Sequence, residues 1–314
     1  MPTTKLKELG DFPELLSGGH AACPGCAGPI ILRQALLAAQ QDGASVVVSI
    51  ATGCMEVSTT LYPNSAWRVP LVHSAFENAA ATISGAEAAY RSLKRQGKVK
   101  DDIRFIAFGG DGGTYDIGLQ SLSGALERGH NFTYICYDNE AYMNTGIQRS
   151  GATPKGAFTT TAPAGKVSSG KTQVKKDLTA IVAAHGIPYV AQAAPHRTRD
   201  LMQKVQKAVA IEGPCFLNIL APCPRGWRYE PADTIQLCKF AADICLWPLY
   251  EIEDGKLKIN YKPREKKPVE EWLKGQGRFK HLFSPKNEHL VAEIQADIDR
   301  RWEALLKREE DDKS

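Results

Sequence analysis

The sequence predicts an α/β fold in which helices cover both faces of a largely parallel β-sheet. Short runs rich in β-branched and aromatic residues alternate with longer segments of helical periodicity along most of the chain. The run at residues 45–50 is almost entirely β-branched, which is typical of a strand buried on both faces. With 314 residues, of which 43% are hydrophobic, the chain can build a sizeable core.

Each element follows from its local pattern. The predicted strands are residues 45–50, 104–108, 132–137, 188–191 and 215–220. The predicted helices are residues 29–41, 76–96, 116–127, 178–184, 198–211 and 289–307. Residues 151–176 are rich in Thr, Ser, Gly and Lys and show no period, so we expect a long ordered loop with a functional role.

The composition changes after about residue 250. Residues 262–268 form a charged linker, and residues 289–307 are charged and amphipathic. Apolar side chains nevertheless recur in this Lys-rich segment, at Trp272, Leu273, Phe279, Leu282 and Phe283. We therefore predict an α/β domain over residues 1–250 and a C-terminal extension over residues 251–314 that packs on partner subunits.

Charge and hydropathy exclude several classes of protein. A net charge of +4 on a chain of this length does not argue for nucleic-acid binding. No stretch approaches the roughly 20 apolar residues of a membrane helix, and residues 1–10 lack the apolar core of a signal peptide. We expect a cytoplasmic protein, in which the eight cysteines more often bind metal than form disulfides.

A glycine-rich segment, residues 109–113, directly follows the predicted strand 104–108. Glycines allow a backbone to approach a phosphate closely. Asp111, at the centre of this segment, can hold a divalent cation that bridges phosphates. Alone the signal is weak, because a tight turn with a surface aspartate would have the same pattern.

A second polar segment, residues 138–146, follows the next strand and so should lie beside the first. Asn139 can offer a side-chain oxygen, and Ala141 a main-chain carbonyl, to an ion held by Asp111. A Gly-Asp-Gly sequence followed about this far on by asparagine resembles the thiamine diphosphate motif, in which Mg²⁺ joins the diphosphate to the protein. The alternative is that Asn139 and Asn144 cap local turns.

Four cysteines have the spacing of a metal site. Cys23 and Cys26 form a Cys-x-x-Cys loop, and Cys54 and Cys223 each follow a predicted strand. Four thiolates suit either Zn²⁺ or an iron–sulfur cluster. Structural zinc usually takes two Cys-x-x-Cys pairs, so the single partners here favour a cluster. The other cysteines, at 136, 215, 238 and 245, resemble small buried hydrophobic residues.

Together these motifs resemble one family from about residue 19 to residue 227. The sequence carries Gly19-His20, Cys23-x-x-Cys26, Ala51-Thr-Gly-Cys54, His73-Ser-Ala-Phe-Glu-Asn78, Gly110-Asp-Gly-Gly-Thr114, Asp116-Ile-Gly118, Tyr137-Asp-Asn-Glu-Ala-Tyr-Met-Asn-Thr-Gly146 and Pro222-Cys-Pro-x-Gly-Trp227. The chain resembles the thiamine-diphosphate-binding β subunit of the 2-oxoacid:ferredoxin oxidoreductases. The resemblance implies the thiamine-diphosphate-binding fold.

The resemblance also implies roles for particular residues. Cys23, Cys26, Cys54 and Cys223 match the ligands of a [4Fe–4S] cluster, and Asp111, Asn139 and the Ala141 carbonyl match the Mg²⁺ ligands. Asn144 matches an asparagine near the thiazolium ring and is the expected catalytic residue. Thr52, Gly53, Cys54, Gly110, Gly112, Met143 and Thr145 complete the expected cofactor-binding set. For His20 and His73 we favour structural roles over proton transfer, whereas Glu56 and Glu77 can equally be solvated or capping carboxylates.

The family's reaction needs more than this chain. It decarboxylates a 2-oxoacid on thiamine diphosphate and passes electrons through clusters to ferredoxin. The sequence lacks the Cys-x₂-Cys-x₂-Cys-x₃-Cys-Pro run of a two-cluster ferredoxin-like module. The resemblance implies that this module and the acid that activates the aminopyrimidine belong to partner subunits. We therefore expect one subunit of a hetero-oligomer.

One departure from the family bears on the substrate. Pyruvate-type members usually continue Cys-x-x-Cys-Gly-Glu, whereas Ala27-Gly28-Pro29 follows Cys26 here. The loss of an acid near the cofactor favours a dianionic substrate, so the sequence leans toward oxalate, oxidised to two CO₂. The alternative is pyruvate, with coenzyme A taking the acetyl group.

Two further hypotheses concern the class of protein. They are a zinc-stabilised scaffold subunit and a thiamine-dependent decarboxylase without redox chemistry.

Overall fold

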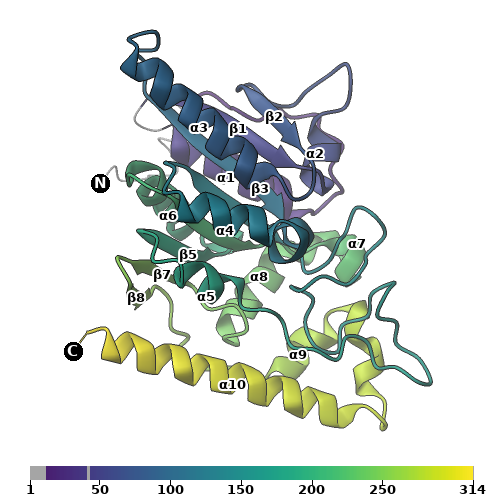
Figure 1. The fold of residues 1–314 in the computed structure, drawn as a ribbon. Helices are drawn as coiled ribbons and strands as arrows, with labels where there is room; N and C mark the ends of the chain where they lie inside the picture. The colour runs from purple at the N-terminus through teal and green to yellow at the C-terminus, as the bar shows by residue number, and fades with distance from the viewer. Residues whose placement is uncertain (1–11, 41–42, 314) are drawn as a thin grey trace.

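The computed structural model describes residues 12–40 and 43–313. Its centre is an eight-stranded sheet with strand order β2-β1-β3-β4-β6-β5-β7-β8 (Figure 1). The strands are β1 (Ser45–Ala51), β2 (Leu71–Ser74), β3 (Ile103–Gly110), β4 (Thr133–Asp138), β5 (Tyr189–Ala193), β6 (Cys215–Leu220), β7 (Tyr250–Glu253) and β8 (Lys256–Ile259). Residues 1–10, for which we expected no signal peptide, lie outside the described residues.

The sheet is parallel from β2 to β5 and ends in an antiparallel hairpin, β7–β8. In the central pairs, Val48 lies opposite Ile106, and Gly110 lies opposite Tyr137. The parallel strands therefore end together at one edge, where ligands bind in open α/β sheets. The predicted fold class is confirmed, although the local pattern did not predict β2 or the hairpin.

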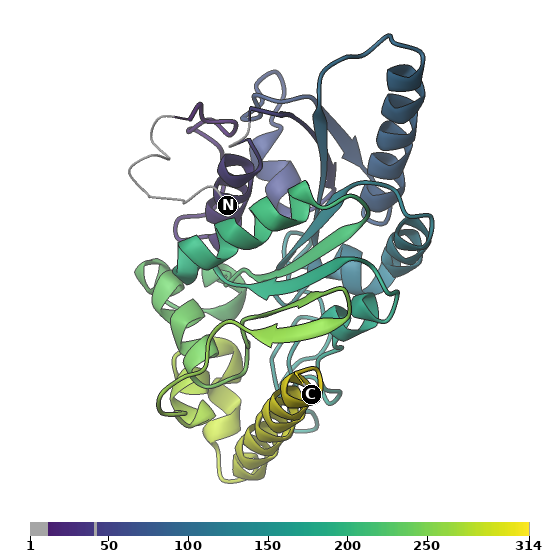
Figure 2. The ribbon, with the colours of Figure 1, turned by 90° about the vertical axis from the view of Figure 1, so that its left-hand side faces the viewer.

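Helices cover both faces of the sheet. They are α1 (Ala27–Ala39), α2 (Cys54–Thr59), α3 (Ala79–Arg95), α4 (Leu119–Glu127), α5 (Leu178–Ala183), α6 (Thr198–Ala210), α7 (Pro224–Trp227), α8 (Thr234–Asp243), α9 (Val269–Lys274) and α10 (Glu288–Asp311). One core cluster packs α1 and α6 on one face, and a second packs α3, α4 and α5 on the other. Figure 2 shows α6 and α3 on opposite sides of the strands.

Alternation along the strands explains this division. Phe105 of β3 belongs to the cluster beneath α3 and α4, and the next residue, Ile106, belongs to the cluster beneath α1 and α6. Tyr134 and Ile135 of β4 divide in the same way. Both faces are buried because successive side chains of a strand point to opposite sides. This is why the strands read as continuous apolar runs.

The helix predicted at residues 116–127 begins differently. Residues Gly112–Ile117 form a turn of π-helix, and α4 follows. The Gly118 N–H donates to the Gly113 carbonyl over 2.7 Å, which closes this wide turn. A Cβ atom at Gly118 would lie 2.4 Å from the same carbonyl oxygen, so the sequence needs glycine there. Such single-turn π-helices are frequent at functional sites.

The C-terminal segment packs on this chain's own core. The sequence predicted packing on partner subunits because the apolar residues of this segment had no evident place in the chain's own fold, and that premise is wrong. Trp272, Phe279 and Leu282 are fully buried, in a cluster that includes Trp227 of the α/β domain. The hairpin β7–β8 also extends the sheet across residue 250. The charge of the segment was misleading, because Lys side chains at the rim lie beside apolar side chains that point inward. The domain division itself, and any partner contact of the remaining surface, stay predictions.

The predicted C-terminal helix is confirmed and is longer than expected. α10 runs along the outer side of α9 and below the hairpin (Figure 1). Ile294 and Ile298 form its buried stripe, as their spacing of four predicts. Among the described residues, no helix combines the length and apolar character needed to span a membrane.

Candidate active site

The predicted cofactor residues come together at the carboxyl ends of β1, β3 and β4. One small cavity of about 20 Å³ lies among them. Its walls include Thr52, Gly53, Cys54, Gly110, Asp111, Gly112, Asn139, Ala141, Met143, Asn144 and Thr145. Phe76, Gly113, Tyr137 and Tyr142 complete its lining. Three segments that are far apart in the sequence thus meet where a parallel sheet places a ligand.

Asp111 is a fully buried carboxylate at the end of β3. Its Oδ2 accepts a hydrogen bond of 2.6 Å from Ser150 Oγ, and its Oδ1 accepts one of 3.2 Å from the Asn139 N–H. Burial, and then the nearby charge of Asp138, raise the pKa of Asp111 well above its usual value. No Lys, Arg or His of the described residues forms an ion pair with it, so a bound cation would relieve the cost of its charge.

The Asn139 side chain points at two other oxygens. One atom of its terminal amide lies 2.8 Å from both the Ala141 carbonyl oxygen and Asp111 Oδ1. With nitrogen in that position the amide donates to both, and with oxygen there three oxygens converge. Ligand oxygens of octahedral Mg²⁺, at 2.0–2.1 Å from the ion, are about 2.9 Å apart. The three groups therefore fit a Mg²⁺ site.

Two glycines of the Asp111 segment are required by close packing. A Cβ atom at Gly112 would lie 2.4 Å from the Tyr142 ring, and one at Gly113 would lie 2.6 Å from the Phe76 carbonyl oxygen. Real Cβ atoms do not approach so closely, so only glycine fits. This packing brings the main chain of the segment against the cavity, which is the arrangement expected of a phosphate-binding turn.

The four predicted cluster cysteines line a second cavity, of about 200 Å³, between α1, α2 and the start of α7. Burial raises the pKa of Cys26 and of Cys54 to about 12, and it also raises the pKa of Cys223. Thiolates in such surroundings need a compensating cation. Cys23 is exposed at the rim.

The spacing of these thiols bears on the kind of metal. Over residues 12–40 and 43–313, no three Cys, His, Asp or Glu side chains gather closely enough to ligate one ion. Zinc needs its four ligands within about 2.0–2.3 Å of a single centre. In a [4Fe–4S] cluster each thiolate binds a different iron, so the four can surround a wider space. The four thiols can therefore surround a cluster of the kind that the family resemblance implies.

The two cavities adjoin. Cys54, Tyr137, Asn139 and Asn144 line both of them. The side chain of Asn144 hydrogen-bonds to Cys54, which opposes the effect of burial on the Cys54 pKa. The predicted cofactor site and the predicted cluster site thus share walls. The remaining cysteines (136, 215, 238 and 245) are buried and line neither cavity, as their sequence positions predicted.

Sequence reasoning missed several residues of this site. Ser150 had no spacing signal because it lies directly before the long loop, and Tyr137 appeared only as a strand residue at the start of a family motif. His73, for which a structural role was favoured, has its Nε2 2.8 Å from Thr52 Oγ1 and its Nδ1 3.6 Å from Glu56 Oε1, and it lines neither cavity. His20 and Glu77 line neither cavity.

Gly28 is the position from which the sequence leaned toward oxalate. Gly28 lies on α1 and is buried beneath Met55, whose Sδ would be 2.3 Å from a Cβ atom at position 28. A glutamate there could not reach toward a substrate without displacing Met55. Gly28 also lines the cavity of the four cysteines, and its packing does not distinguish oxalate from pyruvate.

The fold and the site define a class of protein. Residues 51–219 match the family described as thiamine pyrophosphate enzyme, C-terminal TPP binding domain. The fold is also that of a solved 2-oxoglutarate:ferredoxin oxidoreductase from Magnetococcus marinus, with a TM-score of 0.57 and 20% identity. That similarity covers 76% of this chain and 81% of the other.

Similar sequences identify the family within this class. Pyruvate synthase subunit PorB of Thermotoga maritima is 53% identical over 307 residues, which cover 97% of this chain and 93% of PorB. PorB of Methanocaldococcus jannaschii is 52% identical, over 94% of this chain and 98% of that protein. Ketoisovalerate oxidoreductase subunit VorB of Pyrococcus abyssi is 45% identical, over 94% of each. The chain belongs to the PorB family, the β subunits of the 2-oxoacid:ferredoxin oxidoreductases.

Proposed function

We propose that this chain is the catalytic β subunit of a pyruvate:ferredoxin oxidoreductase and that it holds thiamine diphosphate, Mg²⁺ and a [4Fe–4S] cluster. The observation that carries the proposal is the shared wall of the two cavities, at Cys54, Tyr137, Asn139 and Asn144. These residues would hold thiamine diphosphate on one side and the cluster on the other, and the cluster would supply the electron-transfer chemistry.

The chain's own residues then have distinct tasks. Asp111, Asn139 and the Ala141 carbonyl would hold Mg²⁺, and the glycines at 110 and 112 would let the diphosphate approach the main chain. Asn144, between the cavities, would orient the reactive ring. Bound thiamine diphosphate supplies the carbanion chemistry of decarboxylation. The four thiolates would hold the cluster in a largely buried pocket.

Pyruvate is the substrate we propose. The sequence leaned toward oxalate, but the similar proteins bear the names pyruvate synthase and ketoisovalerate oxidoreductase. A 2-oxoacid with one carboxylate is therefore favoured over oxalate. In this reaction coenzyme A takes the acetyl group, and ferredoxin takes the electrons.

Partner subunits complete the proposal. They would supply the two-cluster ferredoxin-like module, because this sequence has no Cys-x₂-Cys-x₂-Cys-x₃-Cys-Pro run. They would also supply the acid that activates the aminopyrimidine. The test is an anaerobic viologen-reduction assay on the co-purified complex, with pyruvate, 2-oxoisovalerate, 2-oxoglutarate and oxalate compared, each with and without coenzyme A. Coenzyme-A-dependent reduction with pyruvate is expected. Coenzyme-A-independent reduction with oxalate alone would contradict the proposed substrate.

The zinc-scaffold hypothesis makes a different prediction for the same preparation. Metal analysis of the wild type and of a Cys54→Ala variant should differ by about four iron per β subunit. A difference of one zinc, with no change in iron, would support the scaffold and remove the cluster from the proposal.

A further inference from the structure

The turn between the two expected Mg²⁺ ligands has an unusual backbone. Glu140, between Asn139 and Ala141, has a φ of 69°, in the left-handed region. This region is disfavoured for residues with a Cβ atom, so the surroundings must hold the turn. The Glu140 N–H donates to Asp138 Oδ1 over 3.0 Å, and its carbonyl accepts from Thr153 Oγ1 over 2.7 Å.

Two buried cations hold the Glu140 side chain. Arg278 Nη2 donates to Glu140 Oε2 over 2.6 Å, and Lys175 Nζ donates to Glu140 Oε1 over 3.0 Å. The side chain of Glu140 is inaccessible to solvent, and that of Arg278 is only 3% exposed. Arg278 comes from the C-terminal segment, and its guanidinium lies 3.9 Å from the centre of the Trp227 ring. Buried carboxylates in such a double ion pair have little freedom to move.

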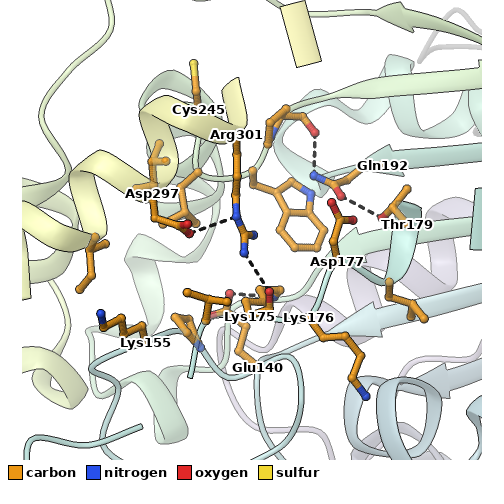
Figure 3. Close-up of a pocket in the computed structure, with 18 of the residues that line it drawn as sticks. Glu140, Lys155, Lys175, Lys176, Asp177, Thr179, Gln192, Cys245, Asp297 and Arg301 are labelled. Atoms are coloured by element: carbon orange, nitrogen blue, oxygen red, sulfur yellow. Dashed lines mark hydrogen bonds and ion pairs between the residues drawn. The ribbon is translucent and has the colours of Figure 1, made fainter. Parts of the chain in front are cut away.

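Lys175 is itself fixed from several sides. Its Nζ lies 2.7 Å from Asp138 Oδ2 and 4.8 Å from the centre of the Trp247 ring. Its main-chain carbonyl accepts a hydrogen bond of 3.0 Å from Arg301 Nη2 on α10. Figure 3 shows Arg301 directed from this helix toward Lys175, beside Glu140. The C-terminal segment thus reaches the turn by two routes, through Arg278 and through Arg301.

We propose that Glu140 is a positioning residue for the metal-binding turn and that the C-terminal segment locks this turn through Arg278 and Lys175. The inference rests on the proposed function. In this arrangement the carboxylates of Asp138 and Glu140 face two cations, so Asp111 is the nearby buried carboxylate left to bind Mg²⁺. The ion pairs of Glu140 with Arg278 and Lys175 hold its strained backbone, and this backbone would orient Asn139 and Ala141 toward the metal.

The direction in which Mg²⁺ affinity changes when Arg278 or Lys175 is replaced distinguishes positioning of the ligands from simple electrostatics. Removing a nearby positive charge lowers the repulsion of Mg²⁺, so Coulomb's law alone predicts tighter binding in Arg278→Met and Lys175→Met. Loss of positioning predicts weaker binding. Residues that orient metal ligands typically change metal affinity by about 10- to 100-fold when they are replaced.

The test is a Mg²⁺ titration by calorimetry, at a fixed thiamine diphosphate concentration, on the complete complex stripped of both. We expect the apparent Kd for Mg²⁺ to rise about 10- to 100-fold in Arg278→Met, Lys175→Met and Glu140→Gln. The double variant Glu140→Gln/Arg278→Met should be no weaker than the worse single variant, because both changes break one ion pair. Arg278→Lys keeps the charge and should recover part of the affinity.

Lys155→Met is the matched control. Lys155 also comes from the long loop and pairs with Glu293 of α10, but neither residue contacts Glu140. Its Mg²⁺ affinity should stay within about twofold of the wild type. Unchanged or tighter Mg²⁺ binding in both Arg278→Met and Lys175→Met would overturn the inference, and the second variant decides if the first misfolds. If the wild type itself shows no Mg²⁺-dependent binding of thiamine diphosphate, the proposed function fails.

Discussion

The indole Nε1 of Trp227 donates a hydrogen bond of 2.8 Å to the main-chain carbonyl of Asn139. Trp227 ends the short helix α7, which begins directly after Cys223, and the Trp227 N–H donates to the Cys223 carbonyl over 2.9 Å. A residue expected to bind Mg²⁺ and a residue expected to bind the cluster are therefore joined through one buried side chain. The two segments are therefore linked by hydrogen bonds through Trp227.

Replacing Trp227 by Phe should keep the ring and lose this hydrogen bond. A buried carbonyl without its partner costs about 1–2 kcal/mol, so we expect the complex to denature a few degrees lower and to bind Mg²⁺ more weakly. Trp67→Phe is the control, because Trp67 Nε1 donates to Thr59 Oγ1 over the same 2.8 Å and neither residue lines either cavity. Calorimetry should show lower stability for both variants and weaker Mg²⁺ binding for Trp227→Phe alone. Equal Mg²⁺ affinities would refute the link.

Cysteine replacements should divide into two groups. Cys223→Ala removes one of the four thiols around the 200 Å³ cavity, so an iron would lose its ligand and the cluster should be lost. Cys136→Ala changes a buried strand residue outside both cavities and should cost only stability. Iron content and the reduced-state EPR signal, measured on anaerobic complexes, check this. Retention of the β-subunit signal in Cys223→Ala would show that the ligand set is wrong.

Position 28 offers a test of packing. Gly28→Ala places a Cβ atom against the buried Met55 side chain and should destabilise the protein by about 1–2 kcal/mol, despite the better helix propensity of alanine. In a Met55→Ala background the contact is gone, so the same change should stabilise by up to about 1 kcal/mol. The change of sign can be measured by denaturation of the four proteins of the cycle. A destabilisation that is equal in both backgrounds would mean that Met55 is not the obstacle.

His196 should make stability depend on pH. Burial, and then the charge of Arg197, lower its pKa from 6.5 to about 4. Between these values the unfolded chain binds a proton that the folded chain does not, so this contribution to stability is present above pH 6.5 and is lost as the pH falls toward 4. The loss should amount to about 2–3 kcal/mol. We would measure the thermal midpoints of wild type and His196→Gln from pH 7 to pH 4. The difference between the two midpoints should change by an amount that corresponds to this loss of stability. A difference that stays constant with pH would contradict the lowered pKa of His196.

The sequence predicted the parts of this molecule that depend on local pattern. The runs at residues 45–50 and 215–220 indicated their strands because a buried parallel strand is continuously apolar. Asp111 and Asn139 could be paired because consecutive parallel strands end at the same edge. The four cysteines could be grouped for the same reason.

What could not be predicted depends on distant contacts. Arg278 lies 138 residues from Glu140 in a lysine-rich segment, and nothing in its local sequence distinguishes it from a surface arginine. The left-handed backbone of Glu140 carries no signal either, since glycine or asparagine would be expected there. The close packing of Met55 on Gly28 has no local sequence signal either. These features arise from packing between segments, which a single sequence does not encode locally.

The central claim is that Asp111 holds Mg²⁺ and thiamine diphosphate beside a cluster that accepts the substrate's electrons. The most direct measurement is the visible absorption of the anaerobic complex after addition of pyruvate and coenzyme A, compared between wild type and Asp111→Asn preparations of equal iron content. We predict that the wild type bleaches as its clusters are reduced, whereas Asp111→Asn keeps its iron and its colour because it no longer binds the cofactor. Bleaching of Asp111→Asn to the same extent as the wild type would contradict the account.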